Sequence, residues 1–539
     1  MTIWSCVKEN KKIIAVLSIF VLLSNAFKLF SPYLLQQIVD FKGKNINYIF
    51  FLIITLIASY LNQLLFEYYN KKFQVSFMTK ESLKLSKLIY KMKYSAIEEY
   101  EPTYLVNRME EAVNNLYRFI SENVSDIISG LVSIVIIIAC FFKYNVSLAI
   151  LYILYALVSF LGYKILNRKL LEKSIVLQDI VSQNYKNILC FMTNVDFLKL
   201  SPDFKNIYTY LKKFFKRSTE ENASVGFFAA SVGIALDAIL EIVQNIIYIL
   251  TFYFAFCNKM SYSQVAAIVL LNSYFKSSMK VLNTTNIGMR DVKASLDYIN
   301  NILMKNCEYS RGIIKINTID TFRIDISNIS FGENTLIESG TINGKKGEII
   351  GIIGESGVGK STLVKTILGL REIEGCRTYF NDIDASEIRS EIIKNKIGYI
   401  SQNPSVFPVT VKENFLLEVY TEEDSKCEKE YQDLLSKKGF KKFRDIAQEM
   451  VVLEGAANMS GGDKQKIAIG RIILRLPDML ILDEFSNSID AETEEYIMNF
   501  LKKTYEEKII VLITHNRDLL KWCNRVYAIQ GKKVEEISL

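Results

Sequence analysis

Long apolar stretches alternate with charged segments over the N-terminal half of the chain. A helix needs roughly 20 predominantly apolar residues to cross the hydrocarbon core of a bilayer. Each stretch approaches or exceeds that length, so we predict six membrane-spanning helices. They cover residues 13–36, 48–68, 127–142, 147–166, 226–256 and 263–285.

Lysine and arginine are concentrated in two of the intervening segments, residues 69–126 and 164–225. Basic loops stay on the cytoplasmic side of a membrane. The short connections near residues 40–47, 143–146 and 258–261 are nearly uncharged, so we expect them outside and both termini in the cytosol. The first apolar stretch meets no small-residue cleavage site, which favours a retained helix over a signal peptide.

Apolar runs become shorter in the C-terminal part and are rich in isoleucine, valine and leucine. Those at residues 349–353, 479–482 and 509–513 are typical of buried parallel strands. We therefore expect a multidomain membrane protein, in which an all-α six-helix transmembrane domain is followed by an α/β P-loop ATPase domain. The expected parts are a transmembrane domain at residues 1–300, a linker at 301–322 and the ATPase domain at 323–539.

A glycine-rich loop follows the first of these runs and precedes a helical pattern. Glycines allow successive N–H groups to converge on phosphate oxygens, and the following helix start adds its positive dipole end. Lys360 would pair with the β- and γ-phosphates of ATP, and the Ser361 hydroxyl would ligate Mg²⁺. The predicted nucleotide contacts are Gly354, Glu355, Ser356, Gly357, Val358, Gly359, Lys360, Ser361 and Thr362.

Two carboxylates and the only histidine of the chain follow the other two runs. Asp483 is predicted to hold the Mg²⁺ shell, Glu484 to orient or deprotonate the attacking water, and His515 to contact the γ-phosphate. Taken singly, such residues also serve as helix caps or as structural histidines. The P-loop upstream favours catalysis.

A small-residue turn, Ser460-Gly461-Gly462-Asp463, opens another predicted helix, and Gln402 follows a predicted strand. Together with the motifs above, and in the same order, these pieces resemble the nucleotide-binding domain of the ATP-binding cassette (ABC) family. The resemblance extends from about Arg323 to the C-terminus. It implies the following roles: Gln402 as the Q-loop residue at nucleotide and Mg²⁺, Ser460, Gly461, Gly462 and Asp463 as the nucleotide-contacting signature, residues 487–490 as the D-loop and His515 as the switch histidine.

In that family, the signature of one subunit closes over ATP held by the P-loop of the other. The resemblance therefore implies two composite sites and a partner. Because this chain contains every catalytic element, a homodimer is favoured. A sister half-transporter remains the alternative.

Three positions depart from the family pattern or match it weakly. Met459 replaces leucine, a volume-conserving change. Asp463 replaces glutamine or glutamate and would add negative charge near the triphosphate, as a modifier of rate. Phe331 is the nearest candidate for the aromatic ring that stacks on adenine, and it could equally belong to the core.

Six spans fused ahead of one cassette resemble an exporter-type half-transporter. Residues 98–100 and 105–110 are similar to the first intracellular loop of such exporters, and residues 454–458 to their cross-talk segment; both could also be amphipathic helix surface. The implied mechanism is alternating access, in which closure of the cassettes on ATP moves the membrane halves.

The cargo is the least determined element. Asp237 and Glu241 share one face of the fifth predicted span with Gln244 and Asn245, where they would line a cavity for cationic or polar cargo. The alternative is that Asp237 lies at the inner interface and snorkels or pairs with a lysine. Peptide export is ranked first, with multidrug or lipid export as alternatives. A membrane protein that uses ATP to gate or signal is a further alternative.

Net charge and cysteine content restrict the partners and the cellular location that we expect. The net charge of +7 is explained by basic loops beside anionic lipids, so no nucleic-acid partner is expected. Scattered cysteines indicate reduced thiols and no cysteine metal site. We expect an integral protein of a bacterial cytoplasmic membrane.

Overall fold

The computed structural model describes residues 2–538, apart from 41–45, 202, 309–311, 332–333, 356, 372, 420–424, 447–448 and 487–488, and apart from some further side chains inside helices and strands. The chain divides into two compact units, Met1–Glu308 and Tyr309–Leu539. Each unit is described by itself.

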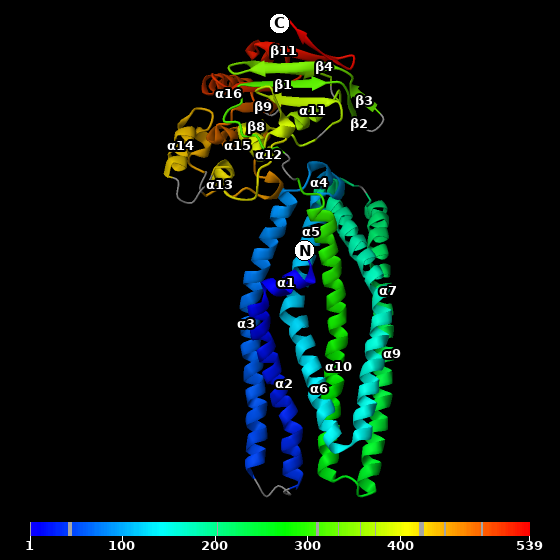
Figure 1. Cartoon of the computed structure of the whole chain (residues 1–539). Coiled ribbons are helices and arrows are strands. Elements are labelled where there is room, and N and C mark those ends of the chain that lie inside the picture. Colours follow the sequence, from blue (N-terminus) through cyan, green and yellow to red (C-terminus); the bar gives the residue numbers. More distant parts are fainter. Residues whose placement is uncertain are drawn as a thin grey trace. The chain divides into compact units, whose positions relative to one another are not determined.

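The first unit is built from long helices that run beside one another (Figure 1). Helix α2 packs on α3, α7 on α9, and α10 on both α6 and α2. Its elements are α1 (Ile3–Glu9), α2 (Lys11–Asp40), α3 (Ile46–Tyr90), α4 (Tyr94–Tyr100), α5 (Pro102–Arg118), the π-helix η1 (Phe119–Asn123), α6 (Val124–Tyr144), α7 (Val146–Thr193), α8 (Val195–Leu200), α9 (Phe204–Phe256), α10 (Tyr262–Asp297) and the π-helix η2 (Tyr298–Met304).

Within the described residues, five helices are long and apolar enough to cross a membrane, and they contain five of the six predicted spans. The remaining prediction, residues 147–166, lies in α7. Its described apolar part, Val146–Val158, is shorter, and the side chains of residues 159–171 lie outside the description. Several helices continue far beyond their apolar windows, so the long basic segments are largely helical.

Aromatic packing joins α6, α7 and α10. The rings of Phe141 and Tyr152 stack with centroids 4.3 Å apart, and Phe275 packs on Tyr152 at 4.6 Å. The Tyr152 hydroxyl donates to Asn272 Oδ1 over 2.5 Å. A buried aromatic ring with a satisfied hydroxyl fixes these helices against one another.

The second unit contains a six-stranded sheet in the order β12-β11-β5-β10-β9-β8, parallel except for β12. Its strands are β5 (Ile349–Gly354), β8 (Ile397–Ile400), β9 (Met479–Asp483), β10 (Ile509–Ile513), β11 (Arg525–Gln530) and β12 (Lys533–Ile537). Every residue of β9 and β10 is buried, as the apolar runs predict. Buried side chains lie on both faces of this sheet.

Two further antiparallel pieces and a set of helices complete this unit (Figure 1). The strands are β1 (Thr321–Ile326), β4 (Gly340–Lys345), β6 (Cys376–Phe380) and β7 (Ile383–Asp384) in one sheet, and β2 (Ile329–Phe331) with β3 (Asn334–Ile337) in a hairpin. The helices are α11 (Lys360–Ile367), α12 (Ser390–Lys396), α13 (Val411–Leu416), α14 (Ser425–Ser436), α15 (Gly461–Arg475) and α16 (Ala491–Thr504). Strand β1 begins two residues before the start expected for this domain.

Candidate functional site

Four parallel strands that lie side by side in the large sheet, β5, β10, β9 and β8, carry most of the predicted site. The glycine-rich loop and the segments that carry Gln402, Glu484 and His515 begin where these strands end. Carboxyl ends of parallel strands meet at the same edge of a sheet, where open α/β sheets bind ligands. The topology therefore brings together motifs that are far apart in the sequence.

The glycine-rich loop runs from the end of β5 to the start of α11. Gly357 and Gly359 have φ values of +83° and +106°, which side chains with a Cβ rarely adopt. Lys360 Nζ donates to the carbonyl oxygens of Gly354, over 2.6 Å, and Glu355, over 3.1 Å. The lysine thus lies across its own loop, with Ser361 exposed in the same helical turn. Ser356 lies outside the described residues.

Asp483 ends β9 and is buried, with 7 % of its surface exposed. The Tyr399 hydroxyl on neighbouring β8 donates to its Oδ2 over 3.2 Å. Burial raises the pKa of Asp483. Oxygen donors suit Mg²⁺, which uses one or two protein carboxylates together with substrate phosphates. Asp483 and the Ser361 hydroxyl fit that requirement, and no cluster of three metal-ligating side chains occurs in the described part of the chain.

Glu484 stands between Gln402 and His515. Gln402 Nε2 donates to Glu484 Oε2 over 2.8 Å, and His515 Nδ1 lies 3.4 Å from Glu484 Oε1. The Glu484 backbone has a φ of +47°, an uncommon value for a residue with a side chain. A carboxylate held between an amide donor and an imidazole is suited to orienting a water molecule and accepting its proton.

Ser460 is the N-cap of α15, and its hydroxyl donates to Asp463 Oδ2 over 2.7 Å. Lys442 Nζ lies 2.7 Å from the same oxygen. Burial alone would raise the pKa of Asp463, but the Lys442 ammonium and the Ser460 hydroxyl outweigh it and hold that pKa below its usual value. The negative charge of Asp463 therefore already has a counter-charge, a pairing that the sequence analysis did not anticipate.

Three supporting residues were missed by sequence reasoning: Tyr399, Lys442 and Gln465. Gln465 Nε2 donates to the backbone oxygen of Gln402 over 2.9 Å, and thereby connects the segment after β8 to α15. Tyr399 could have been found as a polar-tipped residue near the end of a strand beside Asp483. Lys442 and Gln465 bond to residues that are distant in the sequence, so no local sequence pattern identifies them.

Other predicted site residues are not among those that the structure describes. The side chains of Phe331 and Glu454 and all of residues 487–488 are among these. Asp490, the last residue of the predicted D-loop, is the N-cap of α16 and accepts a hydrogen bond from Thr493 N over 2.9 Å.

Two family models match this chain. The model described as the ABC transporter transmembrane region covers residues 14–279, and the ABC transporter model covers residues 339–487. The chain belongs to the ABC transporter family. The predicted family and fold class are thereby confirmed, and an ABC transporter of this kind is an integral membrane protein.

Similar proteins agree with this assignment. A probable ABC transporter ATP-binding/permease protein of Haemophilus influenzae is 27% identical over 277 residues, 50% of this chain and 49% of that protein. Multidrug resistance protein 3 of Entamoeba histolytica is 26% identical over 48% of this chain and 20% of its own length. These matches span about half or less of the relatives.

The fold also has a solved counterpart. The structure of a bacterial Atm1-family ABC exporter with ATP bound superimposes with a TM-score of 0.80, covering 98% of this chain and 95% of that one at 14% sequence identity. At this identity the likeness establishes the fold alone.

Proposed function

We propose that this ABC transporter exports a cargo across the membrane at the expense of ATP hydrolysis, by alternating access. The observation that carries the proposal is the placement of Glu484 between Gln402 and His515 at the edge where β5, β8, β9 and β10 end. A purely structural domain would not need an acceptor carboxylate, an amide and an imidazole beside a glycine-rich loop.

Different residues of the site would bind the phosphates and the Mg²⁺ ion. The N–H groups of residues 354–362 would hold the phosphates, and Lys360 would leave its carbonyl partners to pair with them. Asp483, Ser361 and Gln402 would hold Mg²⁺, which supplies charge neutralisation at the phosphates when bound. Tyr399 keeps the Asp483 carboxylate oriented.

Glu484 acts on water, and its position depends on its neighbours. It would orient the attacking water and take up its proton on the carboxylate, while Gln402 and His515 limit where that carboxylate points. His515 side-chain exposure of 61% leaves the imidazole accessible to a phosphate.

We further propose a homodimer with two composite sites, each formed by the glycine-rich loop of one copy and residues 460–463 of the other. This chain carries both halves, which supports a homodimer over a sister subunit. The nucleotide-binding domain and both termini would face the cytosol of a bacterial cell, because the basic segments lie on that side.

A peptide is the cargo that we propose first. The multidrug name of one relative makes small cationic drugs the second candidate. The test is ATP-dependent uptake of labelled peptides, cationic dyes and short-chain lipids into inside-out vesicles. Uptake of one class, lost in Lys360→Ala, is expected. ATP hydrolysis without uptake of any class would favour a gating or signalling protein.

A further inference from the structure

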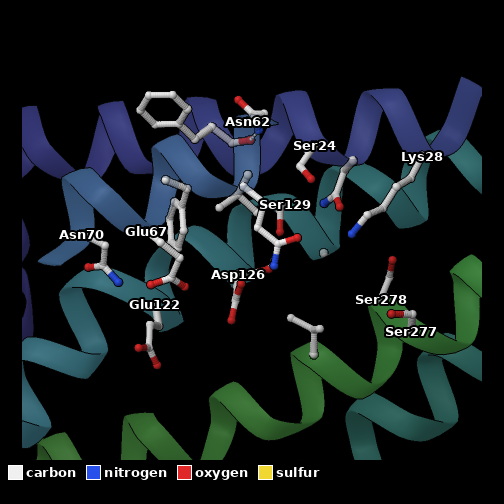
Figure 2. Close-up of a pocket in the computed structure, with 17 residues that line it drawn as sticks. Ser24, Lys28, Asn62, Glu67, Asn70, Glu122, Asp126, Ser129, Ser277 and Ser278 are labelled. Atoms are coloured by element: carbon white, nitrogen blue, oxygen red, sulfur yellow. Dashed lines mark hydrogen bonds between the residues drawn. The ribbon is translucent and has the colours of Figure 1, made fainter. Parts of the chain in front are cut away.

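A cavity of about 350 Å³ lies within the transmembrane unit, between α2, α3, α6 and α10 (Figure 2). Its volume lies in the range of small-molecule sites. The charged residues of its lining are Lys28, Glu67, Glu122 and Asp126.

Most of this lining is polar, although it belongs to helices that are apolar enough to span a membrane. Polar and ionisable side chains are costly in such a setting unless they pair or serve a function. The cavity therefore calls for an explanation other than packing.

The charges are separated along the cavity. Figure 2 shows Glu67, Glu122 and Asp126 gathered at one end, and Lys28 at the other end beside Ser277 and Ser278. Among the residues that the structure describes, none of the three carboxylates forms an ion pair or a hydrogen bond. Three carboxylates that come together without a cation repel one another and anions, and attract a positively charged group.

Two asparagine side chains that line the cavity have donor or acceptor groups that bond to no described residue. Asn70 is 3 % exposed and accepts from the Tyr117 hydroxyl over 3.1 Å, while its own N–H groups bond to no described residue. Asn62 is 8 % exposed; it donates to the Phe20 oxygen, and its Oδ1 accepts from no described residue. Both amides line the cavity, where a polar ligand would hydrogen-bond to these groups.

We propose that this cavity binds the cationic part of the cargo. An ammonium or guanidinium group sits among Glu67, Glu122 and Asp126, and a carbonyl or carboxylate of the same molecule meets Lys28. A short cationic peptide has both features. The inference rests on the proposed export function and names the class of its substrate.

The acidic residues chosen from the sequence are different ones. Asp237 and Glu241 do not line this cavity. Glu241 is already paired, since Lys276 Nζ on α10 lies 3.0 Å from its Oε1. The ion pair with Lys276 therefore accounts for Glu241 without a cargo.

The test measures binding of two peptides with the same dye, trilysine and triglutamate, to the full chain in nanodiscs without nucleotide, by fluorescence polarisation. Trilysine should bind more tightly than triglutamate. In the variant Glu67→Gln/Glu122→Gln/Asp126→Asn, the Kd for trilysine should rise about tenfold or more, because charge-assisted hydrogen bonds are lost.

The control variant Asp237→Asn/Glu241→Gln also removes acids from a membrane helix but lies outside the cavity, and should keep the parent Kd. A thermal midpoint and a size-exclusion profile in nanodiscs that match the parent show that the transmembrane unit of each variant is folded. Equal affinity for the two peptides, or an unchanged Kd in a folded triple variant, would overturn the proposal.

The two proposals fail separately. If the parent takes up a cargo in an ATP-dependent way but does not prefer trilysine, the cavity assignment is wrong and the export function stands. If trilysine binding depends on the three acids but the parent hydrolyses ATP without taking up any cargo, the binding site stands and the export function is wrong.

Discussion

Gln402 donates a hydrogen bond from Nε2 to Glu484 Oε2 over 2.8 Å, across the ends of β8 and β9. The residue proposed to meet nucleotide and Mg²⁺ is thus bonded to the residue proposed to act on water. Any movement of Gln402 toward Mg²⁺ would change the freedom of the Glu484 carboxylate. The segment that holds Gln402 in place should therefore affect the rate of hydrolysis.

Gln465 provides the first test of that relationship. Gln465→Met keeps the side-chain volume but removes the hydrogen bond to the Gln402 backbone oxygen, a bond contributing about 0.5–1.5 kcal/mol. We expect kcat for ATP to fall several-fold in steady-state assays. Gln432→Met, which alters an exposed glutamine on α14, is the matched control and should keep the parent kcat. Equal rates in both variants would rule out this role.

Tyr399→Phe removes the hydroxyl that donates to Asp483 and leaves the ring. The buried carboxylate then loses its orienting donor, so Mg²⁺ should bind more weakly. We expect the Mg²⁺ concentration for half-maximal ATP hydrolysis to rise, with kcat at saturating Mg²⁺ little changed. A fall in kcat without a change in Mg²⁺ dependence would contradict an orienting role.

Lys442→Met should make stability depend less on pH. Asp463 has a lowered pKa in the folded protein, so its pairing stabilises the fold above the unfolded pKa of about 3.9 and is lost as the pH falls through the folded value. The thermal midpoint of the variant should lie below that of the parent near pH 7, and the difference should shrink below about pH 4. Lys441→Met, at the neighbouring exposed position, is the control. A difference that persists undiminished in acid would exclude the ion pair as its cause.

Arg108 gives a prediction for the transmembrane unit. It is 5 % exposed, donates to Gln178 over 2.7 Å and to Glu111 over 3.0 Å, and lies over the ring of Tyr298. Removing the guanidinium leaves Gln178 and Glu111 without this donor. Arg108→Met should lower the thermal midpoint clearly, whereas Arg118→Met, at an exposed position, should not. Similar midpoints would show that this network does not stabilise the unit.

The proposed catalytic edge was accessible to sequence reasoning because its signals are local. Asp483, Glu484 and His515 directly follow apolar runs, and a parallel sheet brings such positions together. The apolar stretches predicted the membrane helices for the same reason, since length and composition are sufficient.

Contacts between segments that are distant in the sequence could not be predicted from local patterns. Lys442 pairs with Asp463, and Lys276 of α10 pairs with Glu241 of α9, yet helical periodicity describes only one helix at a time. The cavity acids come from α3, η1 and α6, so their proximity depends on how helices pack, which no single segment reveals.

ATP hydrolysis by the purified chain in lipid nanodiscs, compared with Glu484→Gln, tests the central claim most directly. The parent should hydrolyse ATP without any partner subunit. The variant should bind ATP but hydrolyse it at least about 100-fold more slowly, which is the usual effect of losing a general base. Equal rates in the two proteins would contradict the role of Glu484. Absence of hydrolysis in a parent that binds ATP would contradict a self-sufficient homodimeric pump.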